Sequence, residues 1–186
     1  LECGDVLMKE LGKRGKHLGS KFSELDLNQI ETGTLDSLAN KIMMDYRTAG
    51  TDPLSLVQGF IANDLMTRKG LFDGGRFRDE DLKEYLLELR GSTFPAMDLA
   101  GKRKMLRDVY DRIIHDRVDF DEYRNSSNHD GLEKLCDAIV DYRQFLGENL
   151  LLDFPALEEE FLNRIKSGTL KKFTKKIKLV LVDEYQ

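Results

Sequence analysis

The sequence contains little that would indicate a disulfide-bonded, membrane-spanning or metal-binding protein. Its two cysteines, Cys3 and Cys136, lie far apart without a C-x-x-C pair, so we expect free thiols in a reducing cytoplasm. Its longest apolar run is only a few residues, whereas a membrane span needs roughly 20, and no charged-then-apolar leader begins the chain. The three histidines match no spacing of metal ligands, even with Cys136, so we predict that they are surface residues.

Neither sign of charge dominates the sequence. The 29 Lys and Arg residues are outnumbered by 34 Asp and Glu residues, which gives a net charge of −5. This balance argues against a uniformly basic nucleic-acid coat but leaves room for a local cationic groove. With 40% hydrophobic and 34% charged residues, the composition is that of a folded protein with a highly charged surface. The 186 residues suffice for one large domain, or for a domain with part of another.

The residues before position 48 alternate between helical and extended patterns. Residues 5–14 have apolar residues at helical spacing, and residues 25–30 form a short extended segment. A turn at residues 32–34 then leads into a helix over residues 35–46. The expected inward face of this helix contains Leu35, Leu38, Ile42 and Tyr46. Such an alternation is typical of an α/β domain with a parallel sheet.

From residue 51 to about residue 168, apolar residues recur every three or four positions, and no convincing period-two segment appears. We therefore expect this stretch to be entirely helical. The first helix should begin at Asp52 and Pro53, because Asp caps a helix and proline suits its first turn. Its buried stripe contains Leu54, Val57, Ile61 and Leu65. Further helices are expected over residues 79–90, 97–118, 130–145 and 155–168.

The last residues predict a strand that ends in two carboxylates. Residues 179–182 (L-V-L-V) form an apolar, partly β-branched run, which is typical of a strand covered on both faces in a parallel sheet. Asp183 and Glu184 follow it directly, at the edge of the sheet where ligands bind. There, one carboxylate can hold Mg²⁺ while the other positions or deprotonates an attacking water. A solvated strand end is the alternative interpretation of the same residues.

These patterns together predict a mainly α fold, in which a helical insertion is flanked by two short pieces of an α/β parallel sheet. Residue 1 is Leu rather than Met, and the sequence stops directly after the apolar strand. We therefore expect both ends to be cut from a longer protein.

Three short elements of the sequence resemble motifs of the UvrD/Rep-type superfamily 1 DNA helicases. Residues 183–186 (D-E-Y-Q) resemble the family's D-E-[FY]-Q motif, which contains the Walker B element and follows a hydrophobic strand. Residues 32–38 (T-G-T-L-D-S-L) are similar to its T-x-H-S-[FL] element, and residues 152–157 (L-D-F-P-A-L) to the L-D-F-x-x-L segment shortly upstream of D-E-[FY]-Q. The three elements occur in the family's order.

The resemblance implies a division of the chain into three parts. Residues 1–48 would belong to the first RecA-like motor domain, and residues 49–172 would form the helical insertion subdomain that interrupts it in this family. Residues 173–186 would be the returning strand with Walker B.

The resemblance also implies an activity: ATP hydrolysis coupled to translocation on single-stranded DNA and to unwinding at the duplex junction, with ATP and Mg²⁺ as cofactors and DNA repair as the setting. Asp183 would coordinate Mg²⁺, Glu184 would act as the catalytic base, and Gln186 would sense the γ-phosphate. Thr34 and Ser37 would lie near the DNA backbone, where hydroxyl groups can bond phosphate oxygens without sequence preference.

The sequence departs from the family pattern in two ways. Asp36 stands where His is usual and Leu38 where Phe is common; because an acidic side chain near phosphates is unfavourable, we expect no DNA contact from Asp36. The Walker A element G-x-x-x-x-G-K-[ST], which cradles nucleotide phosphates, does not occur. We therefore expect the parent protein to hydrolyse ATP and this chain alone to be inactive.

Two basic clusters are candidates for DNA contact, each with a solvated surface as the alternative interpretation. One comprises Lys171, Lys172, Lys175, Lys176 and Lys178, and the other Lys102, Arg103, Lys104 and Arg107. The competing function is a non-enzymatic helical protein-interaction module whose last strand resembles Walker B by chance. The helicase architecture also occurs fused to nuclease domains, and the sequence does not decide that point.

Overall fold

The computed structural model describes residues 9, 13, 30–47, 49–91 and 98–182. The chain forms two compact units, Leu1–Asp45 and Tyr46–Gln186, which are described separately. None of the helices within these residues is both long and apolar enough to cross a membrane.

The first unit contains helix α3, Leu35–Asp45. Ala39, Ile42 and Met43 form its buried face at positions i, i+3 and i+4, whereas Leu35 is 65% exposed. The sequence therefore predicted the helix and the inward position of Ile42 correctly, but Leu35 faces solvent, and Ala39 and Met43 complete the buried face. Of the expected first helix only Lys9 and Lys13 are described, and both are helical; Leu25 and Leu27 lie outside the described residues, and Ile30 is in no strand.

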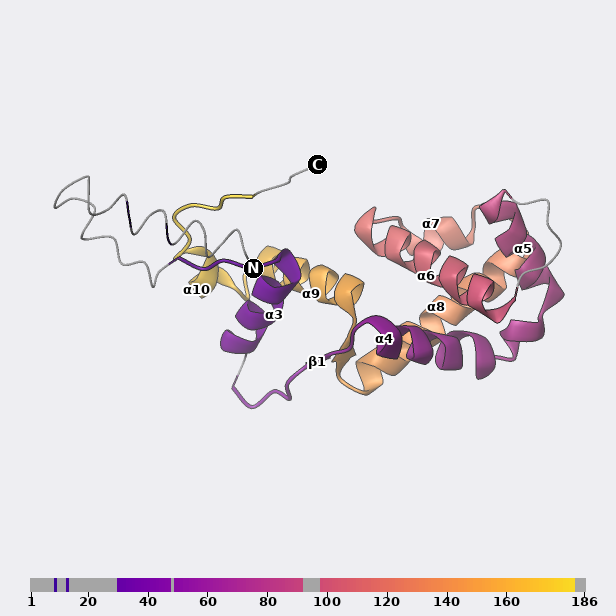
Figure 1. The fold of residues 1–186 in the computed structure, drawn as a ribbon, viewed down its shortest axis with the longest axis horizontal. Helices are drawn as coiled ribbons and strands as arrows, with labels where there is room; N and C mark the ends of the chain where they lie inside the picture. Colours follow the sequence, from indigo (N-terminus) through magenta and orange to yellow (C-terminus); the bar gives the residue numbers. More distant parts are fainter. Residues whose placement is uncertain (1–8, 10–12, 14–29, 48, 92–97, 183–186) are drawn as a thin grey trace. The chain divides into compact units, whose positions relative to one another are not determined.

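The second unit is mainly helical, which confirms the predicted fold class (Figure 1). Its helices are α4 (Gly59–Met66), the π-helix η2 (Thr67–Phe72), the 3₁₀ helix η3 (Arg76–Arg78), α5 (Glu80–Arg90), α6 (Leu99–His115), α7 (Phe120–Arg124), α8 (Asp130–Glu148), α9 (Phe154–Lys166) and α10 (Lys171–Thr174). The short helix α7 was not predicted. Two strands complete the unit: β1 (Ser55–Leu56) and β2 (Leu151–Leu152).

The two strands form a small parallel sheet inside the region that was expected to be entirely helical. Ser55 pairs with Leu151 and Leu56 with Leu152. The amide of Val57 donates to the carbonyl of Leu152 over 2.7 Å. Because this backbone is committed to the sheet, the first helix begins at Gly59 and not at Pro53, and that predicted helix start was wrong.

The predicted strand over residues 179–182 is not formed in the structure. These four residues belong to no strand, and their side chains are 66–76% exposed. A strand is stable only when its backbone N–H and C=O groups have partners, and no strand within the described ranges lies beside this run. Residues 179–182 are thus apolar, as a buried strand would be, but they are exposed in the structure.

Local capping explains where the longer helices begin and end. The carboxylate of Asp79 accepts from the amide of Leu82 over 3.0 Å and starts α5, and Gly91 ends it with a φ of 63°. For α8 the capping residue is His129, whose Nδ1 accepts from the amide of Gly131 over 3.0 Å. Each cap satisfies backbone groups that a helix terminus leaves free.

The core of the second unit lies where α5, α6, α8 and η2 pack together. Every residue of this core is fully or nearly fully buried, and all except Tyr110 and Tyr142 are aliphatic or methionine: Met66, Leu71, Leu82, Leu86, Leu106, Tyr110, Ile113, Leu135, Ala138, Ile139, Tyr142 and Leu146. The two tyrosines carry hydroxyl groups into this apolar interior, so they require polar partners there.

Candidate functional site

The predicted nucleotide and metal residues Asp183, Glu184 and Gln186 lie outside the described residues. The structure therefore gives no geometry for them. Their assignment depends on the sequence and on the family comparison below.

The other predicted site residues, Thr34 and Ser37, are brought together at the start of α3. The amide of Ser37 donates to Oγ1 of Thr34 over 3.3 Å, and Oγ of Ser37 donates to the carbonyl of Thr34 over 2.9 Å. Thr34 thus caps the helix. Both residues are exposed, and the helix N-terminus carries a partial positive charge, which favours an anion such as phosphate.

Two neighbours of this pair shape its surroundings. At Gly33, an added Cβ would lie 2.7 Å from Oγ of Ser37, so glycine leaves the room that the hydroxyl occupies. Asp36 is half-buried, and its Oδ1 has no hydrogen-bond partner among the described residues. Its acidic side chain in the first turn offsets part of the positive end of the helix.

The segment that resembles L-D-F-x-x-L contains a buried carboxylate, Asp153, which is 0% exposed. Its Oδ1 accepts from the hydroxyl of Tyr110 over 3.1 Å and from the amide of Ala156 over 3.1 Å. Its Oδ2 accepts from the hydroxyl of Tyr142 over 2.9 Å and from Arg107 over 3.0 Å. One side chain therefore caps α9 and joins it to α6 and α8.

Burial and neighbouring charges shift the pKa of three side chains that bond Asp153. Burial raises the pKa of both Tyr110 and Tyr142, and the neighbouring Asp153 raises it further, so both phenols stay protonated donors. Burial alone would lower the pKa of Arg107, but the carboxylates of Asp153 and Asp111 raise it. Arg107 and Asp153 therefore form a structural ion pair, because the carboxylate is fully buried and each of its oxygens already accepts two hydrogen bonds.

The basic cluster on α6 is not the free cationic surface that its sequence suggested. Lys102 is 4% exposed and donates to the carbonyl of Phe77 over 2.6 Å; burial lowers its pKa. Lys104 pairs with Asp108 over 2.6 Å, and Arg107 belongs to the Asp153 network. Of the four residues only Arg103 has neither a carboxylate partner nor a buried position within the part of the chain that is described.

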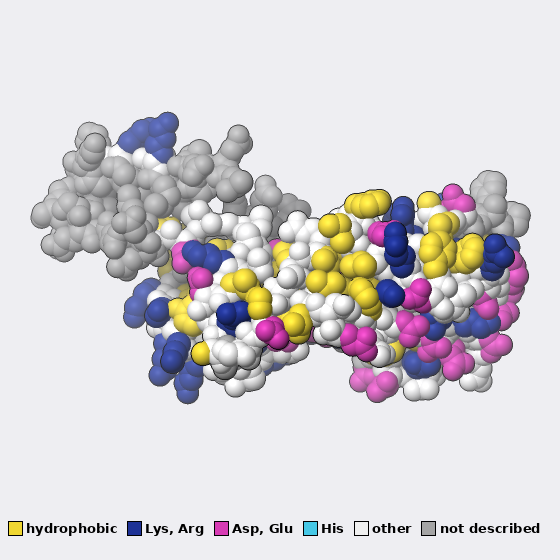
Figure 2. Space-filling view, turned by 90° about the horizontal axis from the view of Figure 1, so that it is seen from below, with side chains coloured by type: hydrophobic (Ala, Val, Ile, Leu, Met, Phe, Trp, Pro, Cys, Tyr) yellow, Lys and Arg dark blue, Asp and Glu magenta, His cyan; other side chains and the backbone are white. Residues whose placement is uncertain are grey.

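The second basic cluster, on α10 and the residues after it, has the opposite character. Lys171, Lys172, Lys175, Lys176 and Lys178 are all exposed, and none forms an ion pair with a described carboxylate. Figure 2 shows charges of both signs interspersed over much of the surface, with several dark blue side chains gathered towards its left end. Within the described part of the second unit, these lysines form a free cationic surface.

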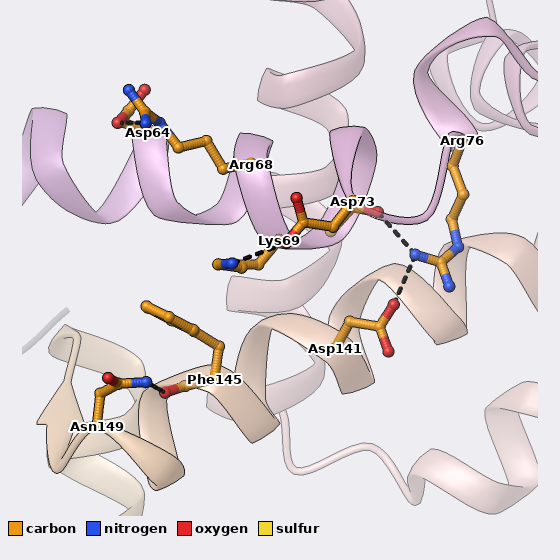
Figure 3. A network of polar contacts seen from close by, with 9 residues as sticks. Asp64, Arg68, Lys69, Asp73, Arg76, Asp141, Phe145 and Asn149 are labelled. Atoms are coloured by element: carbon orange, nitrogen blue, oxygen red, sulfur yellow. Dashed lines mark hydrogen bonds and ion pairs between the residues drawn. The ribbon is translucent and has the colours of Figure 1, made fainter.

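A polar cluster between η2 and α8 was not predicted (Figure 3). Lys69 lies 4.9 Å from the ring centre of Phe145 and pairs with Asp73 over 2.7 Å. Arg76 bonds both the carbonyl of Gly70, at 3.0 Å, and Asp141, at 2.7 Å. π-Helices are rare and short, and no sequence pattern marks this one, so only the structure locates it. Its contacts hold η2 against α8 and indicate a structural role.

Two of the histidines have structural partners. His129 caps α8, and His115 lies 3.3 Å from Glu158 of α9. Cys136 is buried, and burial raises its pKa to about 11, which keeps the thiol protonated and unreactive at neutral pH. His17 lies outside the described residues.

Comparison with known protein families defines the class of the chain as helicase. Residues 7–186 match the model of the UvrD/REP helicase N-terminal domain. Because the match spans nearly the whole sequence, the chain belongs to the UvrD/REP helicase family. The match includes residues 179–182, so family membership does not depend on whether these residues form a strand. Neither a curated protein nor a solved structure gave a match.

Proposed function

We propose that the chain is part of an ATP-dependent DNA helicase, in which ATP hydrolysis drives translocation on single-stranded DNA and unwinding of the duplex ahead of it. The observation that carries this proposal is the family match over residues 7–186, which includes the D-E-Y-Q sequence at residues 183–186. The alternative of a helical interaction module with a chance Walker B does not account for a match of that length.

In this proposal the last residues form half of the nucleotide site. When bound, Mg²⁺·ATP would supply the phosphoryl group, and carboxylate oxygens are the ligands that Mg²⁺ prefers. Asp183 would hold the metal ion, Glu184 would take the proton of the attacking water, and Gln186 would contact the γ-phosphate. No G-x-x-x-x-G-K-[ST] element occurs in these 186 residues, so the proposal assigns the phosphate cradle to sequence outside them.

The proposal places the first DNA contact at α3. The exposed hydroxyl groups of Thr34 and Ser37, next to the positive end of the helix, offer donors to phosphate oxygens. Residues 1–48 and 173–186 would then belong to the RecA-like motor domain, and residues 49–172 would be its helical insertion.

The catalytic assignment is tested in the complete helicase by Glu184→Gln, with Glu122→Gln as a matched control. Glu122 is an exposed residue of α7. Loss of a general base lowers a rate by about 10²–10⁴-fold, so we expect DNA-stimulated ATP hydrolysis to fall by at least about 100-fold in Glu184→Gln and to stay unchanged in the control. Undiminished hydrolysis in Glu184→Gln would show that this residue is not the base.

Two measurements test the remaining parts. Isothermal titration of the 186-residue chain with Mg²⁺·ATP should give no binding in the micromolar range, and a micromolar Kd would refute the assignment of the phosphate cradle to other sequence. For α3, Thr34→Ala should weaken binding to single-stranded DNA, whereas Thr34→Ser, which keeps the hydroxyl, should restore it. Equal affinities for the alanine and serine variants would contradict a phosphate contact at Thr34.

A further inference from the structure

The residues after α9 concentrate positive charge in a chain that is negative overall. Residues 166–178 contain six lysines and no Asp or Glu, whereas the whole chain has a net charge of −5. We define the α10 lysine patch as Lys171, Lys172, Lys175, Lys176 and Lys178. All five are exposed, and no carboxylate of the described residues neutralises them.

Most other cations of this unit do have an acidic partner. Such pairs include Lys69 with Asp73, Lys104 with Asp108 and Arg112 with Asp116, all at 2.6–2.7 Å and all four residues apart on the chain. Lys171 and its C-cap neighbour Lys175 are also four residues apart, at the two ends of α10, so the spacing that pairs opposite charges elsewhere brings two like charges together here. The patch therefore carries unrelieved repulsion that an anionic partner would remove.

Backbone hydrogen bonds and aromatic packing hold the residues of the patch in place. Leu170 is 0% exposed, and its carbonyl accepts from the amides of Phe173 and Thr174, both over 2.9 Å. The ring of Phe173 packs edge-on against Tyr46, with ring centres 5.6 Å apart, and Nζ of Lys176 lies 5.4 Å from the ring centre of Tyr46. The hydrogen bond with Tyr46 raises the pKa of Lys176, so this ammonium stays charged.

We propose that the α10 lysine patch binds the phosphate backbone of nucleic acid without regard to base sequence, as a contact surface additional to Thr34 and Ser37. The choice of nucleic acid among polyanions rests on the proposed function. Lysine provides compact charges that attract phosphate, whereas the planar guanidinium of arginine is better suited to bidentate recognition. The patch therefore strengthens DNA binding without selecting a sequence, and this added affinity should decrease as the salt concentration rises.

The test is fluorescence anisotropy of the 186-residue chain with labelled single-stranded and duplex DNA of two unrelated sequences. The variant Lys171→Glu/Lys172→Glu/Lys175→Glu is compared with Arg68→Glu/Lys104→Glu/Arg112→Glu. The control changes the net charge by the same amount, at positions whose side chains are 65–78% exposed and ion-paired. Circular dichroism verifies that each variant is folded.

We expect the patch variant to lose at least about tenfold in affinity on both sequences, and the control to lose less than about threefold. The slope of log K against log salt should become shallower by about 2–3 in the patch variant, because each phosphate contact on duplex DNA contributes about 0.9. Equal losses in patch variant and control, or no DNA binding by the wild-type chain, would overturn the proposal.

A second arm distinguishes nucleic acid from an anionic membrane surface. The apolar run at residues 179–182 follows the lysines, so vesicles of phosphatidylserine and phosphatidylcholine serve as the competing probe. Binding to vesicles that persists while DNA fails to compete would overturn the assignment of nucleic acid. The two proposals can fail separately, because they have different readouts. Undiminished ATP hydrolysis in Glu184→Gln would count against the proposed function, whereas unchanged DNA affinity in the patch variant would count against the α10 lysine patch alone.

Discussion

The guanidinium of Arg107 lies 3.0 Å from the carboxylate of Asp153, and this ion pair joins α6 to the residue that caps α9. Tyr110 and Tyr142 donate to the same carboxylate from α6 and α8. Three donors in the interior of the second unit thus share one acceptor residue. Because a buried charge or hydroxyl without a partner is costly, Asp153 should contribute more to stability than an ordinary helix cap.

We predict that Asp153→Ala lowers the free energy of unfolding by about 3–5 kcal/mol, the cost of leaving one member of a buried ion pair without its partner. The variant also removes the cap of α9. Urea denaturation followed by circular dichroism measures the change.

The matched control is Asp98→Ala. Asp98 is exposed, and its carboxylate caps α6 by accepting from the amide of Gly101 over 2.8 Å. Loss of such a cap costs about 1 kcal/mol. If Asp153→Ala cost no more than Asp98→Ala, the buried network would add nothing beyond capping.

A second prediction concerns the packing of the π-helix η2 against α8. At Gly70, an added Cβ would lie 2.9 Å from the carbonyl oxygen of Ala138 and 3.3 Å from Cδ2 of Leu106. The first contact is with backbone, which cannot rotate away. We therefore expect Gly70→Ala to lower the free energy of unfolding by about 1–3 kcal/mol, as overpacking does in other cores.

Gly147→Ala is the corresponding control within α8. Nothing lies within 4 Å of the Cβ that it would add. Alanine replaces glycine in a helix with a gain of about 0.5–1 kcal/mol. The two substitutions should therefore shift the urea midpoint in opposite directions, and a stabilising Gly70→Ala would mean that η2 is not packed against α8 as observed.

Some of the helix boundaries that rest on capping could be predicted from the sequence, although the start expected at Asp52 and Pro53 could not. Asp79 and Gly91 bound α5 as expected, and Pro155 lies in the first turn of α9. These signals are local, because a cap bonds only to amides two or three residues away. The pairing of β1 with β2 could not be predicted, since strands of two residues are too short to show an alternating pattern.

Long-range polar contacts were equally inaccessible from the sequence. Lys102 looks like a member of a basic cluster, yet the carbonyl of Phe77 holds its ammonium in a buried position. The sequence marked Asp153 as part of a motif but did not show that donors from α6 and α8 converge on it. Asp183, Glu184 and Gln186 lie outside the described residues, and the Glu184→Gln variant tests their proposed role.

A third prediction follows from the pKa of Cys136. Burial raises that pKa from its ordinary value of 9.0 to about 11, so the folded state favours the neutral thiol. The resulting stability is present below about pH 9 and is lost as the pH rises towards about 11. We expect wild type to lose stability relative to Cys136→Ala over that interval, because all other titrating groups are common to both chains. A constant difference in unfolding free energy across this range would contradict a buried thiol.

The last prediction distinguishes the exposed run at residues 179–182 from the buried strand that its sequence suggested. Leu181 is 76% exposed, whereas Leu157 of α9 is 0% exposed. In the 186-residue chain, Leu181→Asp should therefore change the free energy of unfolding by no more than about 0.5 kcal/mol, and Leu157→Ala should lower it by about 2–5 kcal/mol.

A charge at position 181 should also improve solubility, since an exposed apolar segment of high β-propensity favours self-association. A large loss of stability in Leu181→Asp would instead mean that the run is buried in solution, because an unpaired carboxylate is tolerated at a solvated position but not within a sheet.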